Sequence, residues 1–160
     1  MLRVELSRRS DGSGMLRCKR ADGSVTWEKR AAKQASFFAV RDLTHFAVEK
    51  ELGYQQGFFG LVAAGWDIED TKGKSARGAL PAEALEVEFL SGMFNRETAP
   101  GQPLDAAEFN RHARMFAESA GRPALRKLSD DEITRVRTLR AELLQQWFGL
   151  AHEGTIELTF

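Results

Sequence analysis

Residues 37–52, FFAVRDLTHFAVEKEL, form the stretch that decides the fold of this 160-residue chain. On a helix with about 100° per residue, their apolar side chains point in nearly every direction and leave no wide polar face. A helix that is apolar all round is usually buried. The stretch therefore predicts a central helix around which the other elements pack.

Three ionisable residues interrupt this apolar helix on one side. Asp42, His45 and Glu49 follow one another at i, i+3 and i+7, so they share an arc of roughly 60° on a helix. Buried carboxylates and imidazoles are costly unless they are paired, hydrogen-bonded or bound to a metal ion. The stripe therefore predicts either a structural polar network or a functional site.

Two interpretations of this stripe are open from the sequence. In the first it is structural: a carboxylate pairs with Arg41 or another arginine, and His45 bonds a backbone carbonyl. In the second the three side chains bind one divalent metal ion, or a carboxylate orients the imidazole for proton transfer. A metal site would need a further ligand from elsewhere in the chain, because one helix rarely supplies a complete coordination shell.

Composition limits the classes of function. The 23 lysines and arginines balance the 23 aspartates and glutamates, so no basic excess predicts binding to nucleic acid or to an anionic membrane surface. The single Cys18 excludes an internal disulfide and a cysteine-rich zinc site. The length fits a single domain over residues 1–160.

The sequence has no feature of export or membrane insertion. It begins with MLRVELSRR, which alternates and carries charges. No stretch approaches the run of about 18 uncharged apolar residues that a spanning helix needs. We therefore expect a cytoplasmic protein that does not contact a membrane.

Both ends of the chain show the alternation of β-strands. Three short alternating runs occupy the first 30 residues, and Asp-Gly dipeptides at 11–12 and 22–23 favour hairpin turns between them. Residues 155–160 alternate again, and an isolated C-terminal strand needs an edge to pair with. We therefore expect it to join the N-terminal meander in one sheet with an apolar face that includes Val25 and Trp27.

The middle of the chain has helical periodicity. The predicted fold class is therefore α+β, with an antiparallel sheet of about four strands packed against about five helices. A short helix is expected over 55–64, and a third begins at Pro81 and breaks at 100–103. Asp105 with Glu108 and Ser129 with Glu132 have capping-box spacing and predict two more helices. The expected inward positions of the last three helices are Leu85, Phe89, Met93, Phe109, His112, Ala113, Phe116, Ile133, Val136, Leu143 and Trp147.

The longest predicted loop spans residues 65–80, GWDIEDTKGKSARGAL. Its KGKS segment matches part of the phosphate-binding loop motif, but Ile68 stands where that motif needs a glycine. The loop ranks second as a site, because long loops often carry function and this one follows the helix expected to pack closest to the stripe. Its candidate ligands, charge partners and apolar anchor are Trp66, Asp67, Asp70, Lys72, Lys74 and Arg77.

Adjacent aromatic residues at 58–59 and 147–148 point to an exposed surface. Neighbouring helix positions lie about 100° apart, so both members of a pair cannot enter one core layer. An exposed aromatic side chain, a free strand edge and zero net charge together predict a homodimer with twofold symmetry.

Residues 37–70 resemble a segment of a family of small, uncharacterised bacterial proteins. The resemblance rests on DLTHFAVE at 42–49, GFFGL at 57–61 and GWDI at 65–68. It implies no activity, cofactor or partner. Relatives tend to carry a histidine directly before the aspartate, where this chain has Arg41. The resemblance therefore favours a salt-bridged network or an anion-binding variant over metal binding.

The favoured interpretation is a non-catalytic binding or interaction module whose buried stripe is structural. The alternative is a small metal-dependent or acid–base enzyme, with Asp42, His45 and Glu49 at the bottom of a pocket roofed by the loop 65–80. The sequence specifies no substrate, reaction or ligand, and it leaves open whether the protein is an enzyme.

Overall fold

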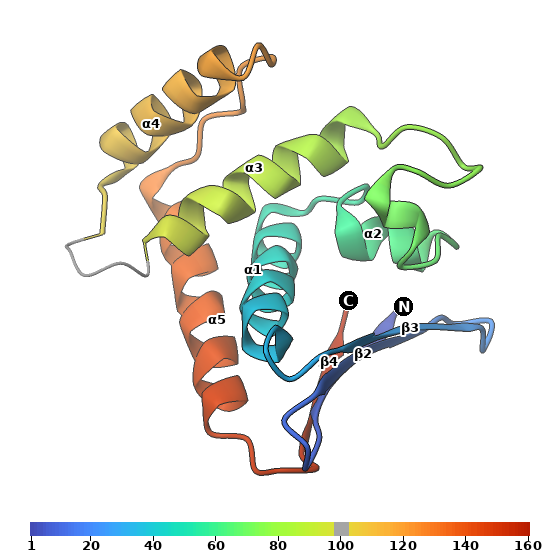
Figure 1. Ribbon diagram of the computed structural model, residues 1–160. Coiled ribbons are helices and arrows are strands. Elements are labelled where there is room, and N and C mark those ends of the chain that lie inside the picture. Colours follow the sequence, from blue (N-terminus) through green and yellow to red (C-terminus); the bar gives the residue numbers. More distant parts are fainter. Residues whose placement is uncertain (98–102) are drawn as a thin grey trace.

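The computed structural model describes residues 1–97 and 103–160. The elements in chain order are β1 (Arg3–Arg8), β2 (Gly14–Lys19), β3 (Val25–Arg30), α1 (Ala35–Leu52), α2 (Phe58–Ala63), the 3-10 helix η1 (Asp70–Lys72), α3 (Ala82–Arg96), α4 (Ala106–Ser119), α5 (Asp130–Phe148) and β4 (Thr155–Thr159). Figure 1 shows α1, α2 and α5 on one side of the sheet, with α3 across them and α4 farthest away. The predicted α+β class is confirmed. The predicted helix break at 100–103 falls largely outside the described residues.

The two ends of the chain pair with each other in the sheet. Its strand order is β3-β2-β1-β4, and all neighbours are antiparallel. Beyond the strands, the backbone N–H groups of Leu2 and Phe160 each donate to the other residue's carbonyl oxygen at 2.9 Å. The predicted pairing of the C-terminal strand with the meander is confirmed. Strand β4 covers an edge of β1 that would otherwise be open.

The inward face of the sheet is apolar on β1 and β2 but polar on β3. Thr26 lies opposite Cys18 in the register and is buried like it, whereas Trp27 is 61% exposed. The prediction that Val25 and Trp27 belong to the apolar face is therefore wrong. The polar face of β3 turns inward because it has buried partners, such as the backbone N–H of Ile68, which donates to the Thr26 hydroxyl at 3.0 Å.

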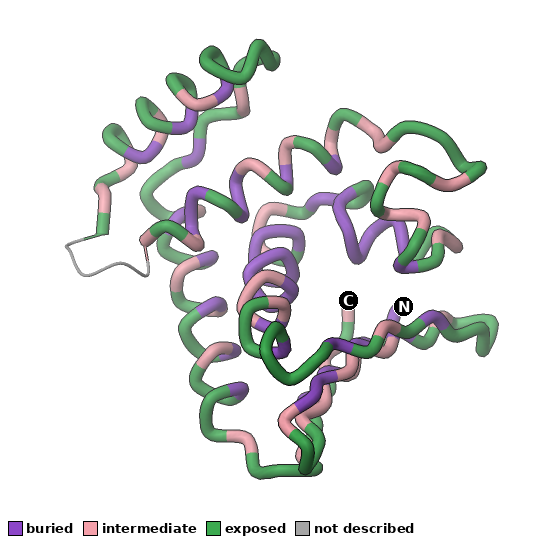
Figure 2. The backbone as a smooth tube through the Cα atoms, viewed as in Figure 1, coloured by how far each residue is buried: buried purple, intermediate pink, exposed green. Residues whose placement is uncertain are grey.

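Helix α1 is central, as predicted. It packs against α3 and α5 and also contacts α2 and β2. Figure 2 shows its middle turns as buried. The core around it includes Leu2, Val4, Leu6, Leu16, Cys18, Leu43, Phe46, Val48, Phe59, Val62, Val87, Leu90, Phe94, Ile133, Val136, Leu143, Trp147 and Ile156. The all-round apolar pattern of residues 37–52 therefore reflects neighbours on nearly every side.

The capping signals correctly predict where α4 and α5 begin. The side chain of Asp105 accepts a hydrogen bond from the Glu108 N–H, and Ser129 forms a reciprocal capping box with Glu132. Pro81 directly precedes α3 rather than forming its first residue. Helix α2 is shorter than the predicted range 55–64, because Glu49 fixes where it begins (see below).

The inward faces of α3 and α4 differ in part from the predicted ones. On α3 the predicted Met93 is buried, but Leu85 is 36% exposed, and the fully buried residues are Val87, Leu90 and Phe94. On α4 His112 is exposed, so its predicted interior position is wrong. Helix α4 packs against α3 and needs only a narrow apolar stripe, formed by Phe109, Ala113 and Ala117. The predicted inward residues of α5 are all buried.

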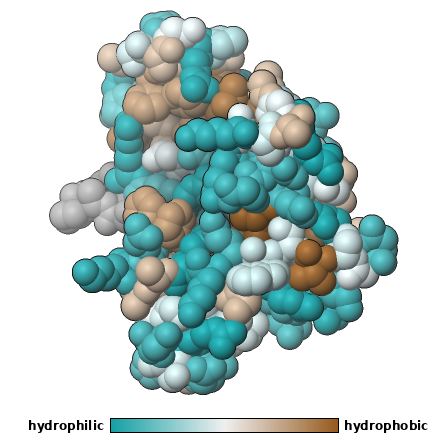
Figure 3. All heavy atoms as spheres, turned by 45° about the vertical axis from the view of Figure 1, so that its right-hand side comes forward, coloured by the Kyte–Doolittle hydropathy of each residue, from teal (hydrophilic) through white to brown (hydrophobic). Residues whose placement is uncertain are grey.

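Apolar side chains on the surface are dispersed. Phe58 and Phe59 are both buried, so the first aromatic pair leaves no exposed ring, whereas Phe148 is 58% exposed beside the buried Trp147. Figure 3 shows brown and tan patches separated by hydrophilic side chains on the face in view. Among the described residues, no helix combines the length and the apolar character needed to cross a membrane.

Candidate functional site

Glu49 is fully buried near the end of α1 and holds the first turn of α2. Its carboxylate accepts hydrogen bonds from the backbone N–H groups of Phe59 at 3.2 Å and Gly60 at 3.0 Å. These donors have no partner within the helix, and a negative charge suits the helix N-terminus. A Cβ atom on Gly57 would lie 2.4 Å from the Glu49 Cδ atom. Glycine at 57 therefore allows the close approach that starts α2 at Phe58.

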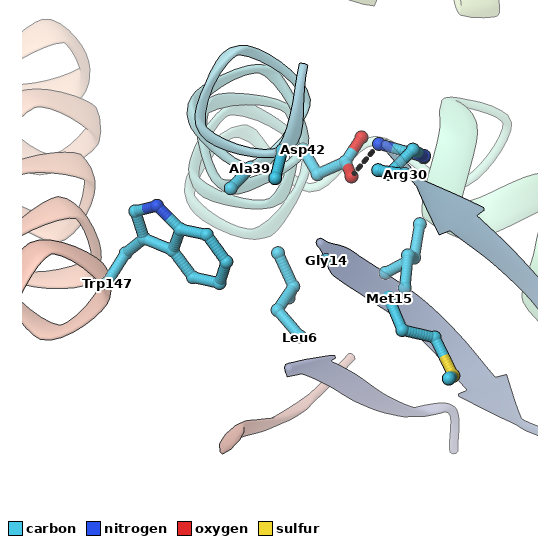
Figure 4. A pocket seen from close by; sticks show the side chains of 9 residues that line it. Leu6, Gly14, Met15, Arg30, Ala39, Asp42 and Trp147 are labelled. Carbon is cyan, nitrogen blue, oxygen red and sulfur yellow. Dashed lines mark hydrogen bonds and ion pairs between the residues drawn. The ribbon is translucent and has the colours of Figure 1, made fainter. Parts of the chain in front are cut away.

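Asp42 faces the sheet. Its Oδ2 atom accepts a hydrogen bond from Arg30 Nη1 at 3.1 Å, and both side chains are buried. Figure 4 shows this carboxylate turned toward Arg30, beside a cavity of about 10 Å3 that Trp147 also lines. The Oδ1 atom has no hydrogen-bond partner among the described residues. Burial raises the pKa of Asp42, and the nearby arginines offset this only in part.

His45 lies between carboxylates from two helices. Its Nε2 atom is 3.0 Å from Glu88 Oε2 on α3, and its Nδ1 atom is 3.8 Å from Glu49 Oε1. The first contact is an ion pair at 3.0 Å, whereas the second is too long for a hydrogen bond and acts through charge. Burial alone would lower the pKa of His45, but the two carboxylates outweigh burial and raise it. The charged imidazolium is therefore favoured.

Glu88 joins this buried imidazole to the surface. Its Oε2 atom also accepts a hydrogen bond from Arg41 Nη2 at 3.0 Å. The Glu88 side chain is 56% exposed and that of Arg41 is 31% exposed, so the pair forms an outer layer over His45. The hydrogen bond from His45 lowers the pKa of Glu88 to about 2.

Two open hollows lie on either side of the Arg41–Glu88 pair. The α1–α3 hollow has a volume of about 550 Å3 and is lined by Ser36, Phe37, Phe38, Val40, Arg41, His45, Glu88, Ser91, Gly92 and Asn95. The loop hollow has a volume of about 520 Å3 and is lined by Arg41, His45, Phe58, Leu61, Glu69, Thr71, Lys72, Lys74, Leu80, Ala84, Leu85 and Glu88. Both volumes fall within the roughly 300–1,000 Å3 of small-molecule sites. Arg41, His45 and Glu88 line both hollows.

A second polar stripe, on α3, faces the first and was missed from the sequence. Glu88, Ser91 and Asn95 repeat the i, i+3 and i+7 spacing found on α1, so the same search applied to the third helix would have found them. Asn95 Oδ1 accepts a hydrogen bond from the Thr44 hydroxyl at 2.7 Å. The buried Ser91 hydroxyl has no hydrogen-bond partner among the described residues.

The loop 65–80 brings two of its candidate residues to the loop hollow, Lys72 and Lys74. Lys72 Nζ lies 3.1 Å from a Glu28 oxygen and 2.6 Å from a Glu69 oxygen. Lys74 forms no hydrogen bond or ion pair with any residue that the structure describes. Residues of the loop therefore line this hollow together with His45, whereas Asp42 and Glu49 line neither hollow.

The remaining loop candidates bond within the loop or to Arg20, which directly follows β2, and line neither hollow. Asp67 pairs with Arg20 at 3.0 Å. Arg77 pairs with Asp70 at 3.2 Å, and its guanidinium lies over the Trp66 ring. These contacts hold the loop in place and give its acidic residues partners other than the stripe.

The predicted stripe is buried but does not converge on one point. Asp42 turns to β3, His45 to α3, and Glu49 to the backbone of α2. The nearest partner of His45 is the Glu88 carboxylate, whereas the structural interpretation alone expected a backbone carbonyl. Within residues 1–97 and 103–160, no group of three or more His, Cys, Asp or Glu side chains is arranged to hold a metal ion.

Comparisons with family models, curated proteins and solved structures give no match. The chemistry of the two hollows is therefore the basis for assigning a function. The residues that line both hollows are an imidazole, a guanidinium and a carboxylate, and aliphatic and aromatic side chains complete the lining.

Proposed function

We propose that this protein is a non-catalytic binding module that holds a small organic ligand in the two adjoining hollows. The observation that carries the proposal is the position of His45, which is only 2% exposed and yet lines both hollows. Ligand sites are largely apolar with a few well-placed polar groups that orient the ligand. A charged imidazole at the floor of two mostly apolar hollows fits that description.

The contacts of His45 favour binding over proton transfer. A general base needs an unprotonated nitrogen within reach of the substrate. Here Nε2 is paired with the Glu88 carboxylate, and the two carboxylates favour the charged ring. The imidazole is therefore better suited to pairing with an anion than to accepting a proton.

Apolar side chains supply the contact area. Phe37 and Phe38 line the α1–α3 hollow, and Phe58, Leu61 and Leu80 line the loop hollow. Covering such surface contributes about 25 cal/mol per Å2 removed from water. A ligand with an apolar body would gain affinity from either hollow.

Binding can be measured by thermal shift and calorimetry with a panel of small neutral, anionic and cationic organic molecules. We expect at least one class to raise the melting temperature of the wild-type protein. Leu85→Asp should abolish this shift, because residue 85 lines the loop hollow. Met115→Asp is the matched control, since Met115 is 57% exposed on α4 and lines neither hollow. Unchanged binding by Leu85→Asp, or no binding across the panel, would contradict the proposal.

The metal-dependent or acid–base enzyme is the second candidate. It is favoured by the His45–Glu88 contact, since a carboxylate bonded to an imidazole is a common arrangement in proton transfer. Elemental analysis after metal-supplemented expression tests the metal-dependent form. Stoichiometric metal that is lost in His45→Gln would support this candidate over the binding module.

The homodimer stays a prediction, supported by the exposed ring of Phe148 and by the open edge of β3. Light scattering across a dilution series tests it, and a constant mass of 17.9 kDa would show a monomer. The cytoplasmic location and the resemblance of residues 37–70 to a bacterial family also stay predictions.

A further inference from the structure

We propose that the site selects a carboxylic acid, and that the side chain of Glu88 occupies the carboxylate position until such a ligand displaces it. This inference rests on the proposed binding function and names its ligand class. The position in question lies between Arg41 and His45 on α1, at the junction of the two hollows.

Two donors define the carboxylate position. Arg41 Nη2 and His45 Nε2 each lie 3.0 Å from the same atom, Oε2 of Glu88. Hydrogen bonds from cationic donors to a carboxylate are about twice as strong as neutral ones. Both donors belong to α1, one turn apart, so the helix presents them on the same side.

Glu88 can leave this position, unlike the buried carboxylates of Asp42 and Glu49. Its side chain is 56% exposed, so it can turn toward water without moving α3. Asp42 and Glu49 are 1% and 0% exposed and are held by Arg30 and by the backbone of α2. When Glu88 turns away, the buried charge of His45 loses its nearest partner. A buried charge without a partner is costly, so the vacated position favours another anion.

The charges around the loop hollow also favour an anion. Arg41, His45, Lys72 and Lys74 line it, against Glu69 and Glu88. Once Glu88 has turned outward, four cationic side chains face one acidic side chain. Lys72 forms ion pairs with Glu28 and Glu69. The ammonium group of Lys74, by contrast, has no partner among the described residues.

The surroundings of this position specify the rest of the ligand. Phe58, Leu61 and Leu80 form an apolar wall beside the two donors, which suits a short aliphatic or aromatic body. One turn along α3 from Glu88, the buried hydroxyl of Ser91 lines the other hollow and has no hydrogen-bond partner among the described residues. It is suited to donate to the second oxygen of the ligand carboxylate.

Calorimetry with hexanoate and its uncharged amide, hexanamide, tests the proposal. At about pH 5.5, below the ordinary pKa of histidine, wild type should bind hexanoate and not hexanamide. Glu88→Gln should bind hexanoate roughly tenfold more tightly, because the competing negative charge is gone. Arg41→Gln should bind it at least about tenfold more weakly, because one of the two donors is lost.

Matched controls separate site effects from general charge effects. Glu142 on α5 and Arg111 on α4 are exposed, and their side chains form no hydrogen bond or ion pair with the described residues. Glu142→Gln and Arg111→Gln should therefore bind hexanoate like wild type. Circular dichroism of each variant shows whether the fold is kept.

Carboxyl NMR of Glu88 gives a second measurement. In the free protein the contact with His45 lowers the pKa of Glu88 to about 2. Saturating hexanoate should raise this pKa toward the ordinary value of 4.5, because the side chain has moved into water. An unchanged pKa at saturation would show that Glu88 stays in place, which overturns the displacement.

The outcomes distinguish this inference from the proposed function. Equal binding of hexanamide and hexanoate, or weaker hexanoate binding by Glu88→Gln, would overturn the carboxylate proposal and leave the binding module standing. Binding of hexanoate by Glu88→Gln alone would overturn the displacement, because the ligand would then fail to replace Glu88 in wild type. No binding of hexanoate or of any panel member by either protein would overturn both.

Discussion

The Nε2 atom of His45 lies 3.0 Å from the Oε2 atom of Glu88, and this contact joins a buried imidazole on α1 to a half-exposed carboxylate on α3. The imidazole is only 2% exposed, whereas its partner reaches the surface. The charge of a core residue therefore depends on a side chain that solvent and ligands can contact, which has consequences for both stability and binding.

The stability of the protein should fall as the pH rises above neutrality. The folded-state pKa of His45 is raised above its ordinary value of 6.5. Its contribution to stability is therefore complete below 6.5 and is lost as the pH rises through the higher folded-state pKa. Denaturant titrations from about pH 5 to about pH 9 should show this loss in wild type and not in His45→Gln.

The control for this pH effect is His112→Gln, since His112 is exposed on α4. Its stability should follow the wild-type curve across the range. Parallel curves for wild type and His45→Gln would show that the contacts of His45 do not shift its titration on folding.

Two glycine substitutions should have opposite effects on the free energy of unfolding. Gly57→Ala places a Cβ atom 2.4 Å from Glu49 Cδ and should cost about 2 kcal/mol or more. Gly92→Ala meets nothing within 4 Å in the middle of α3 and should stabilise by about 0.4–1 kcal/mol. Urea denaturation measures both, and effects of the same sign would contradict the role of Gly57.

Glu49→Gln should destabilise the protein by about 2 kcal/mol, because an amide presents one acceptor oxygen to two buried N–H donors. Hydrogen exchange at Phe59 and Gly60, the two donors, should become faster. The exposed Glu142→Gln serves as the control and should change stability by less than about 0.5 kcal/mol. Unchanged exchange at both amides would argue against the capping role.

Thr44→Val should cost about 1–3 kcal/mol, because it leaves a buried donor unpaired. The Arg140 Nε atom donates to the Thr44 hydroxyl at 2.8 Å, and Arg140 is only 9% exposed. Chemical denaturation measures the loss. Thr138→Val on the exposed side of α5 has the same change in shape and should be nearly neutral, so equal effects of the two would contradict a specific bond.

The sequence by itself determined the elements and the burial of α1. The caps at Asp105 and Ser129, the strand alternation and the all-round apolar helix each depend on residues two to four positions apart. Geometry over that range is fixed by the backbone of a helix or a strand. Such local patterns are therefore readable before the fold is known.

Alternation did not determine which face of β3 turns inward. It shows that a strand has two faces, and the apolar one is the usual choice for the core. In this fold the polar face of β3 bonds the Ile68 N–H and the Asp42 carboxylate. Satisfying those buried groups outweighs burying Trp27, and the packing of the loop and the helix that supply them cannot be read from the alternation of β3.

Only the tertiary structure decided the partners of the stripe. The helix spacing placed Asp42, His45 and Glu49 on one face, and their burial followed from the sequence. Which carboxylate, guanidinium or backbone amide each one meets depends on how α1 packs against β3, α3 and α2. A hydrogen bond forms only within about 3.5 Å, so displacements much smaller than a helix diameter decide among partners. Those displacements are set by the packing of the whole core.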